Sequence, residues 1–572
     1  MPEQPSETIF LLANRDLRLG PDSPLLRLMR ELEPYFREVL KPRIYALEGT
    51  YRALLRHGLL QDYPELHALP AGRQGGLVAM SDMIVAGSGR DGGCQRVIYL
   101  VDPRDPTSLL PDSLALKREC VVTETTFLAT YAAASEWYRL QWRLTPGSDG
   151  QGEHPSVAGY FLPPELSRRL FGRADNGLAA RTIALIAHDT RKKHMLQFAV
   201  QHFELLRAFA ARVATGTTGT LLNGRLPERL ARAWEELDEE IAVFQRLGQM
   251  PRRLQQALEE RQQLEAARQS LQQRLGADAW VQAQPSGPRG GDIQIAEMVR
   301  TGACQTVLFF EDPFVSREHE ADIQLMERTT RIPGQEALCL HERQSATQWA
   351  QNWGRCLALG VDEPMTLSQA FRRLWGVDLV LAGVDGRPEA ELWQAIVAKA
   401  AWYLHGHIAR CAQQRAAEGE PVRVAVTWGR EMGEVLEDLR EVPVALARLD
   451  EQHPGLFRHL ADSRFRDPHH LLAVPTVGLI GTTHPRHEAN ANAERLAALY
   501  AGQALRIPHP AFYRQRSHDT PYQPELDELV EHWERLDLAI LSCDCLPESW
   551  GATALVPGPT GSRLQWAETT VG

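Results

Sequence analysis

Polar residues gather at a few points in the second third of the sequence, each at or directly after a short apolar run. The groups are His188 and Asp189 with Lys192, Thr215 to Gly219, Ser286 to Asp292, Asp312, and His319 with Asp322. Glycine-rich turns, hydroxyl groups and a lysine suit an anion such as phosphate, because their N–H and O–H groups donate hydrogen bonds to its oxygens. Carboxylates and imidazoles accept and donate protons. The set predicts an anion-binding site with acid–base groups beside it.

For these residues to form one site, strands and helices must bring the turns that carry them to the same edge of a sheet. Short runs rich in Val, Ile, Leu and Phe alternate with amphipathic helical stretches along the chain, which is typical of βαβ units in a parallel sheet. The predicted strands are Thr8–Ala13, Thr182–His188, Thr306–Asp312, Asp378–Val384, Arg423–Trp428, Thr476–Gly481 and Leu536–Ser542. We expect an α/β protein of doubly wound parallel sheets, with the polar turns at the carboxyl ends of the strands, where such sheets bind ligands.

The chain contains an internal repeat. Residues 8–106 and 182–314 share the order strand, helix, Gly-containing turn, Gly-Gly turn, strand and Asp-Pro. The first copy keeps Asp102 at a strand end but lacks the acid–base groups. Its corresponding positions hold Asn14 and Arg15 for His188 and Asp189, Glu48 to Tyr51 for Gly216 to Gly219, and Leu77 for Asp292. We expect this copy to be catalytically silent, with a structural or regulatory role, and residual anion binding near Arg15 or Arg73 as an alternative.

One segment interrupts the second copy. Residues 226–277 are rich in Leu, Glu, Gln and Arg, and Pro227 and Pro251 stand where each of two helices can begin. Their Leu residues recur at helical spacing, which predicts a two-helix hairpin for packing or oligomer contact. We therefore expect three domains, at residues 1–150, at 178–355 with the hairpin inserted at 226–277, and at 362–560.

The motifs of the second copy, in order, resemble methylglyoxal synthase. They are AHD-x-x-K from Ala187, TGTTG from Thr215, SGPRGGD from Ser286, FFEDP from Phe309 and H-x-x-D from His319. The likeness runs from Arg181 to about Trp349, apart from the hairpin. It implies conversion of dihydroxyacetone phosphate to methylglyoxal and phosphate, a carbon–oxygen lyase reaction, with neither a metal nor an organic cofactor and in a homo-oligomer.

The resemblance also implies roles for single residues. Asp292 would be the base that removes a C–H proton, His319 and His188 would donate to the substrate oxygens, and Asp322 and Asp189 would orient these groups or relay protons. Asp312 is a weaker candidate that holds the loop. The phosphate would be held by Lys192, Thr215, Thr217, Thr218, Ser286 and Gly287, and Arg328 would contact the phosphate or another subunit.

The last third of the chain, from about Thr366 to Leu555, more faintly resembles the sugar-binding domain of SorC-type transcription regulators. The likeness lies in RVAVTWGREMGEVLEDL, TVGLIG, EANANAERLAALYAGQALRIPHPAF and LDLAILSCD. It implies a sugar-like effector at this domain. Glu431 places a carboxylate at the start of a helix, which disfavours phosphate there. No basic helix-turn-helix precedes the domain, so we expect no DNA binding.

The composition and net charge indicate which classes of protein can be excluded. The 572 residues are 44% hydrophobic and 24% charged, with a formal charge of −11, so an ordinary folded protein is expected, without a nucleic-acid or membrane partner. Eight cysteines without a CxxC pair and an N-terminus without a basic signal region fit the cytoplasm. Cys543 and Cys545 are closely spaced, but a metal site there is not favoured.

The sequence leaves alternatives to an enzyme. A phosphosugar sensor would keep the anion site and report its occupancy through the flanking domains, and a scaffold would use the hairpin and outer domains for assembly. A sensor needs no base, however, so the Asp292, His319 and Asp322 set favours the lyase.

Overall fold

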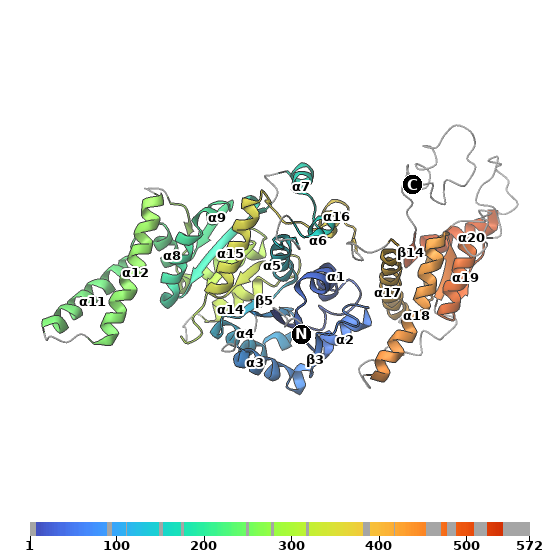
Figure 1. Cartoon of the computed structure of the whole chain (residues 1–572), viewed down its shortest axis with the longest axis horizontal. Coiled ribbons are helices and arrows are strands. Elements are labelled where there is room, and N and C mark those ends of the chain that lie inside the picture. Colours follow the sequence, from blue (N-terminus) through green and yellow to red (C-terminus); the bar gives the residue numbers. More distant parts are fainter. Residues whose placement is uncertain are drawn as a thin grey trace. The chain divides into compact units, whose positions relative to one another are not determined.

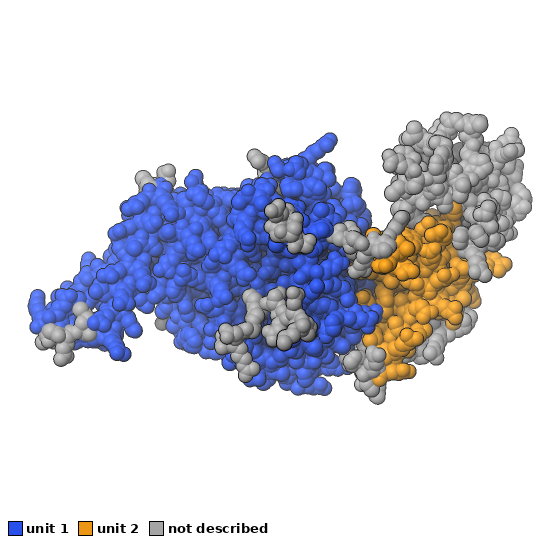
Figure 2. Space-filling model, in the orientation of Figure 1, with its two compact units in different colours: residues 1–55, 59–386 blue, residues 56–58, 387–572 orange. Residues whose placement is uncertain are grey.

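The computed structural model describes most of the chain. The described residues are 7–87, 94–109, 111–147, 153–172, 177–246, 251–275, 279–315, 320–380, 389–416, 418–452, 471–476, 488–507 and 523–541. They form two compact units, shown in different colours in Figure 2: unit 1 comprises residues 1–55 and 59–386, and unit 2 comprises 56–58 and 387–572. The expected α/β fold is confirmed, because the sheets of both units are parallel and their strands alternate with helices.

The first sheet of unit 1 has the strand order β3-β2-β1-β4-β5. Its strands are β1 (Glu7–Ala13), β2 (Arg43–Leu47), β3 (Leu66–Leu69), β4 (Cys94–Leu100) and β5 (Thr126–Leu128), and its helices are α1 (Pro24–Tyr35), α2 (Glu48–Arg56), α3 (Gly76–Gly87), α4 (Pro111–Val122) and α5 (Tyr131–Arg143). Helices cover both faces of this sheet, so β1 is buried and its sequence is a nearly continuous apolar run (Figure 1).

The second sheet repeats this order as β8-β7-β6-β9-β10. Its strands are β6 (Thr182–Ala187), β7 (Ala211–Ala214), β8 (Gln282–Ala283), β9 (Thr306–Phe310) and β10 (Leu338–Leu340), and its helices are α8 (Lys192–Gln201), α9 (Phe203–Arg207), α10 (Gly216–Leu222), α13 (Gly291–Arg300), α14 (Glu320–Thr329) and α15 (Arg343–Ala358). The register is shared as well, since Leu11 pairs with Ala46 as Leu185 pairs with Ala214. Topology and register together confirm the internal repeat.

One hydrophobic core joins the two copies. Ile9 and Leu11 of β1 and Ile183 and Leu185 of β6 belong to the same cluster of buried residues, which also includes residues of α1, α5, α8 and α15. The edge strands β5 and β10 contact each other, and α5 packs against α15. The opposite faces of the two sheets have separate cores, one with α3 and α4 and the other with α13 and α14. The central sheet is therefore held against the N-terminal copy by apolar packing.

The helical hairpin predicted for residues 226–277 is confirmed as α11 (Glu228–Arg246) and α12 (Arg252–Leu275). It projects from the central sheet, as the green pair of helices in Figure 1. Its base packs against α8, and Leu271 is buried in the common core. The remaining helices of unit 1 are α6 (Pro155–Tyr160), α7 (Pro164–Phe171) and α16 (Leu367–Trp375).

Unit 2 contains a four-stranded sheet of order β13-β12-β11-β14. Its elements are α17 (Glu389–Ala416), β11 (Val422–Val426), α18 (Arg430–Gln452), β12 (Leu471–Pro475), α19 (Ala489–Leu499), β13 (Gln503–Ala504), α20 (Gln523–Glu534) and β14 (Leu538–Ile540). Among the helices that the structure describes, none is long and apolar enough to cross a membrane.

Two strand predictions differ from the structure. The strand predicted at residues 476–481 lies earlier, at β12, where Leu471 and Ala473 are buried and the chain pairs with β11 up to Pro475. Thr476 is already a bend, and residues 477–481 lie outside the described ones. Residues 378–380 form no strand, and the rest of the strand predicted to end at Val384 also lies outside the described residues. An apolar run alone did not distinguish a strand from a loop beside a sheet.

Candidate functional site

The carboxyl ends of β6 and β9 are joined by a hydrogen bond through a histidine side chain. The backbone N–H of Asp312 donates to Nδ1 of His188 at 2.6 Å, and the His188 N–H donates to the carbonyl of Phe310 at 3.1 Å. The His188 ring stands edge-on to Phe309, with centroids 4.6 Å apart. Because Nδ1 accepts a hydrogen bond, the neutral imidazole carries its proton on Nε2. His188 is thus fixed as an Nε2 donor at the edge of the sheet.

Asp312 is anchored on the same loop. Its carboxylate accepts hydrogen bonds from Thr190 Oγ1 at 2.5 Å and from the Phe314 N–H at 3.1 Å, and Arg191 Nε lies 3.8 Å away. Burial alone would raise its pKa, but these two hydrogen bonds and the charge of Arg191 hold the pKa below its ordinary value. Asp312 is therefore an ionised group that fixes the loop, as the sequence analysis expected of it.

Asp189 and Lys192 flank the short turn after β6. The Lys192 ammonium is mostly buried and donates to the Asp189 carboxylate, whose side chain is largely exposed. An ion pair with an exposed carboxylate is weak because water competes for both groups. A phosphate that reaches Lys192 can therefore displace Asp189 at small cost.

The turns after β7 and β8 are packed against each other. The Gly216 N–H donates to the carbonyl of Pro285 at 3.0 Å, and a Cβ at Gly216 would lie 2.8 Å from the Ser286 nitrogen. Only glycine permits this approach. Thr215 caps the start of α10 and, like Thr218, is buried, whereas Thr217 is partly exposed. The threonine turn and the serine turn thus form one continuous surface at the carboxyl edge.

The Gly-Gly turn places Asp292 at the start of a helix. Gly290 has φ of 89°, and a Cβ at Gly291 would lie 2.0 Å from the Pro285 carbonyl oxygen, so both positions require glycine. Asp292 follows in the first turn of α13 and is 3% exposed. Ser286 and Gly287 precede it as the cap and first residue of a 3-10 turn. A buried carboxylate next to the predicted anion-binding turn has an environment that suits a general base.

Two other predicted site residues lie on α14. Asp322 is in the first turn and partly exposed, whereas Arg328 is exposed in the last turn, six residues further on. Six residues of helix span about 9 Å, so Arg328 lies well away from the end of α14 that follows β9. His319 lies outside the described residues. The structure therefore assembles the turns of β6, β7, β8 and β9 at one edge and gives no position for the second predicted histidine.

The equivalent edge of the N-terminal copy keeps the same backbone frame with other side chains. The Asp102 N–H donates to Asn14 Oδ1 at 2.9 Å, as the Asp312 N–H donates to His188. The Asn14 amide nitrogen then donates to Asp105 at 3.0 Å and to Thr107 at 3.3 Å. Asn14 thus accepts the backbone N–H as His188 does, and its amide nitrogen donates to other side chains of the same copy.

The Gly-Gly turns of the two copies also correspond. Gly75 has φ of 87°, like Gly290, and a Cβ at Gly76 would lie 2.0 Å from the Pro70 carbonyl oxygen, as at Gly291. This correspondence places Leu77 at the position of Asp292. Leu77 lies against the apolar core of its copy. The alignment of Leu77 with Asp292 therefore rests on matching backbone geometry as well as on sequence order.

A buried charged cluster next to β9 was not predicted from the sequence. Glu311 at the end of β9, Glu327 of α14 and His341 after β10 offer ligand atoms within 4.8 Å of one another, a set able to hold a metal ion. The Lys117 ammonium of α4 donates to both carboxylates, at 2.7 Å for Glu311, and so supplies the positive charge of the cluster. Lys117 belongs to the N-terminal copy, 194 residues before Glu311, and no motif links the two.

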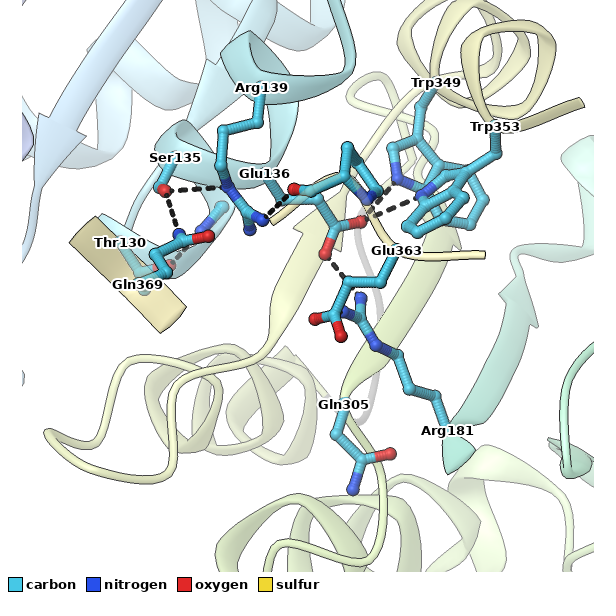
Figure 3. A network of polar contacts seen from close by, with 12 residues as sticks. Thr130, Ser135, Glu136, Arg139, Arg181, Gln305, Trp349, Trp353, Glu363 and Gln369 are labelled. Atoms are coloured by element: carbon cyan, nitrogen blue, oxygen red, sulfur yellow. Dashed lines mark hydrogen bonds and ion pairs between the residues drawn. The ribbon is translucent and has the colours of Figure 1, made fainter. Parts of the chain in front are cut away.

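A second network joins the copies at the amino end of the central sheet (Figure 3). Glu136 of α5 accepts hydrogen bonds from the indole nitrogens of Trp349 and Trp353 of α15, at 2.9 and 3.1 Å, and from Arg181 at 2.6 Å. Arg181 immediately precedes β6 and therefore lies at the sheet edge opposite the candidate site. Arg139 donates to the carbonyl of Pro364. This network connects α5 with α15 and with the residue before β6, so we assign it to stability.

The candidate effector region of unit 2 is only partly described. Gly429 has φ of 123° and precedes α18, whose first turn contains Glu431, as expected. Arg430 pairs with Glu434 at 3.0 Å on the same helix. The turn around Gly481 and the Cys543 and Cys545 pair lie outside the described residues. Within the described part, the start of α18 thus carries a carboxylate where an anion would otherwise bind.

Part of the chain is similar in sequence to methylglyoxal synthases. No family model matches the chain. The methylglyoxal synthase of Agrobacterium fabrum is 30% identical over 152 residues, which are 27% of this chain and 80% of that protein. The methylglyoxal synthase of Ralstonia nicotianae is 29% identical over 187 residues, which are 32% of this chain and 92% of that protein.

Two solved structures also match in part. The methylglyoxal synthase of Elizabethkingia anophelis covers 30% of this chain at 22% identity, with a TM-score of 0.19 and 76% of its own chain matched. A probable sor operon regulator of Shigella flexneri covers 30% at 24% identity, with a TM-score of 0.19 and 58% of its own chain matched. The family is therefore assigned from the sequence matches and not from these two structures. The chain belongs to the methylglyoxal synthase family, through a region that makes up about 27–32% of its length.

Proposed function

We propose that the central sheet is a methylglyoxal synthase, which converts dihydroxyacetone phosphate to methylglyoxal and inorganic phosphate. The observation that supports this most is the buried Asp292 at the start of α13, next to the Ser286 turn that packs on the threonine turn after β7. A protein that only binds phosphate has no need of a buried carboxylate beside its anion site, because that carboxylate repels the ligand.

The first step needs a base. Asp292 takes a proton from the hydroxymethyl carbon next to the carbonyl, and the electron pair of that C–H bond forms an enediolate. His188 donates through Nε2 to an oxygen of this intermediate, since its Nδ1 already accepts from the Asp312 N–H. His319 and Asp322 complete the oxygen and proton contacts, and Asp189 orients them, in the roles that the family resemblance implies.

The second step expels the phosphate. The electron pair of the enediolate forms a C=C bond as the C–O bond to phosphate breaks, and the phosphate leaves with the C–O bonding pair. The enol that remains takes up a proton on carbon and becomes methylglyoxal. Lys192, the hydroxyls of Thr215, Thr217, Thr218 and Ser286, and the Gly287 turn stabilise the charge on the departing phosphate. Arg328 is exposed, and we assign it to a contact with another subunit rather than to the phosphate.

The role of Asp292 can be tested by substitution. Asp292→Asn removes the base and keeps the shape, so kcat should fall by about 10²- to 10⁴-fold, while inorganic phosphate should bind at least as tightly because a repelling charge is gone. Glu297→Gln on the same helix is the matched control, because Glu297 is exposed and pairs only with Arg300 in the ion pairs described. Unchanged kcat in Asp292→Asn would exclude Asp292 as the base. Bound phosphate without turnover in the wild type would favour a sensor.

Unit 2 is proposed to bind a neutral, sugar-like effector. The supporting observation is the parallel sheet with the turn before α18, together with the Glu431 carboxylate that disfavours a phosphate at the start of α18. An effector changes activity only if it binds the active and inactive arrangements with different affinity.

A further inference from the structure

We infer that Lys117, from the catalytically silent N-terminal copy, is a positioning residue for the active site of the central copy. The inference rests on the proposed function and adds a part of the chain that the family resemblance does not cover. Lys117 is on α4, it is 9% exposed, and its ammonium bonds to Glu311 and Glu327 across the boundary between the two copies.

Glu311 is next to Asp312 on the segment that carries the site. Neighbouring side chains at the end of a strand point to opposite sides. Glu311 thus reaches the N-terminal copy, while Asp312 accepts from Thr190 and donates its N–H to His188. The Asp312 N–H that bonds to His188 Nδ1 belongs to the peptide unit directly after Glu311. A shift of Glu311 therefore moves the N–H that fixes the His188 tautomer.

A second contact lies on the other side of Asp312. The Arg118 guanidinium, adjacent to Lys117 on α4, stands 5.8 Å from the ring centroid of Phe314, a distance at which a cation and an aromatic ring attract each other. The Phe314 N–H donates to the Asp312 carboxylate. Lys117 and Arg118 therefore hold the chain at Glu311 and at Phe314, and Asp312 lies between these two points.

Among the described residues, the buried cluster contains charges of both signs. Lys117 and Arg331 are the cations, with Arg331 3.6 Å from Glu327, and Glu311 and Glu327 are the anions. His341 lies 3.4 Å from Glu327 and 3.7 Å from Glu311, and burial together with the Lys117 and Arg331 charges lowers its pKa to about 3, so it is neutral. Removing Lys117 takes away the ammonium that links Glu311 to α4, so the end of β9 loses a contact that holds it against the N-terminal copy.

The test compares four variants of the full chain. Lys117→Met should lower kcat by about 10- to 100-fold, because a misplacement of about 1 Å has effects of this size. The KM for dihydroxyacetone phosphate should change by less than about threefold, since the phosphate contacts come from the turns after β6, β7 and β8. Lys117→Arg should restore kcat. Lys41→Met, at an exposed lysine of the same copy, should behave as the wild type.

A double variant separates positioning from stability. Lys117→Met with Glu327→Gln removes one buried charge of each sign, so its melting temperature should return toward that of the wild type while kcat stays low. If kcat recovers along with the melting temperature, Lys117 only balances charge and the inference is wrong. Wild-type kcat in a folded Lys117→Met variant would also overturn it.

A measurement that does not depend on enzyme turnover tests the role of Lys117 independently of the proposed lyase activity. The ¹⁵N shifts of the His188 ring report which nitrogen carries the proton, and the wild type should show it on Nε2. Lys117→Met should shift the ring toward a mixture of tautomers, and Lys117→Arg should reverse the shift. If the wild type makes no methylglyoxal but the His188 shifts respond in this way, the lyase proposal fails and the positioning role stands. Unchanged His188 shifts in Lys117→Met would contradict the positioning role whatever the activity.

Discussion

At the scale of single residues, the two copies place different side chains at the same backbone N–H. His188 and Asn14 both accept a backbone N–H at the same place in the frame. His188 then has an Nε2 donor at the sheet edge, whereas the Asn14 amide donates to Asp105 and Thr107. The sequence could predict that Asn14 replaces His188, but only the structure shows that the shared backbone contact survives.

This comparison predicts the effect of His188→Asn. The asparagine can keep the Asp312 contact, as Asn14 does with Asp102, but it lacks the imidazole donor. The fold should therefore remain, with kcat lower by about 10²- to 10³-fold, the usual effect of removing one oxyanion donor. Thermal unfolding and steady-state kinetics check this, with His67→Asn, at a partly exposed histidine, as control. Equal kcat in His188→Asn and the wild type would remove His188 from the mechanism.

At the scale of elements, sequence patterns predicted the strands β1, β6, β9, β11 and β14 and the hairpin because these depend on local apolar spacing, and the order of elements indicated the repeat. They did not predict how the copies meet. Contacts such as Glu136 with Trp349 and Lys117 with Glu311 join residues about 200 positions apart, and no local pattern specifies them. The position of β12 was missed for a related reason, since pairing with β11 places a strand at Leu471–Pro475, which the local pattern did not specify.

The Glu136 network predicts a dependence of stability on pH. Burial alone would raise the Glu136 pKa, but Arg181, the two indoles and Arg139 bring it below its ordinary value of 4.5. A lowered pKa in the folded state stabilises the protein above the unfolded-state pKa, and this stabilisation is lost as the pH falls through the folded-state value. Glu136→Gln should cost about 3–5 kcal/mol at pH 7 and flatten the loss of stability below about pH 4.5.

Urea unfolding of the Glu136→Gln variant at several pH values measures both effects. The control is Glu153→Gln, because Glu153 is half-exposed in its ion pair with Arg143 and should contribute at most about 1 kcal/mol. If Glu136→Gln and Glu153→Gln lose the same small amount, the network does not hold the two copies together.

At the scale of the whole molecule, the chain combines a region of the methylglyoxal synthase family with a degenerate copy and a separate α/β unit. The order of these parts could be predicted from the sequence. The core that the two copies share could not be predicted from the sequence. The helix faces that form it are apolar, and so are the helix faces that pack within a single copy, so the pattern does not distinguish them. The N-terminal copy is therefore better described as a part of the central fold than as an appendage.

Regulation by unit 2 is tested by removing it. A chain that ends at residue 380 keeps α16 and the Glu363 and Pro364 contacts of unit 1. If unit 2 transmits effector binding, neutral sugars should change the activity of the full chain by about 5- to 150-fold and leave the shortened chain unaffected. Identical kinetics of both chains with every sugar tried would leave unit 2 without a regulatory role.

The central claim is tested most directly by giving dihydroxyacetone phosphate to the purified full chain and measuring methylglyoxal and inorganic phosphate together. The proposed elimination releases one of each for every substrate consumed, and the account predicts this equal release without added metal or cofactor. Substrate that is consumed without methylglyoxal, or phosphate released alone, would point to another reaction. No release of either product, from a folded protein that binds phosphate, would contradict the claim that this chain is a methylglyoxal synthase.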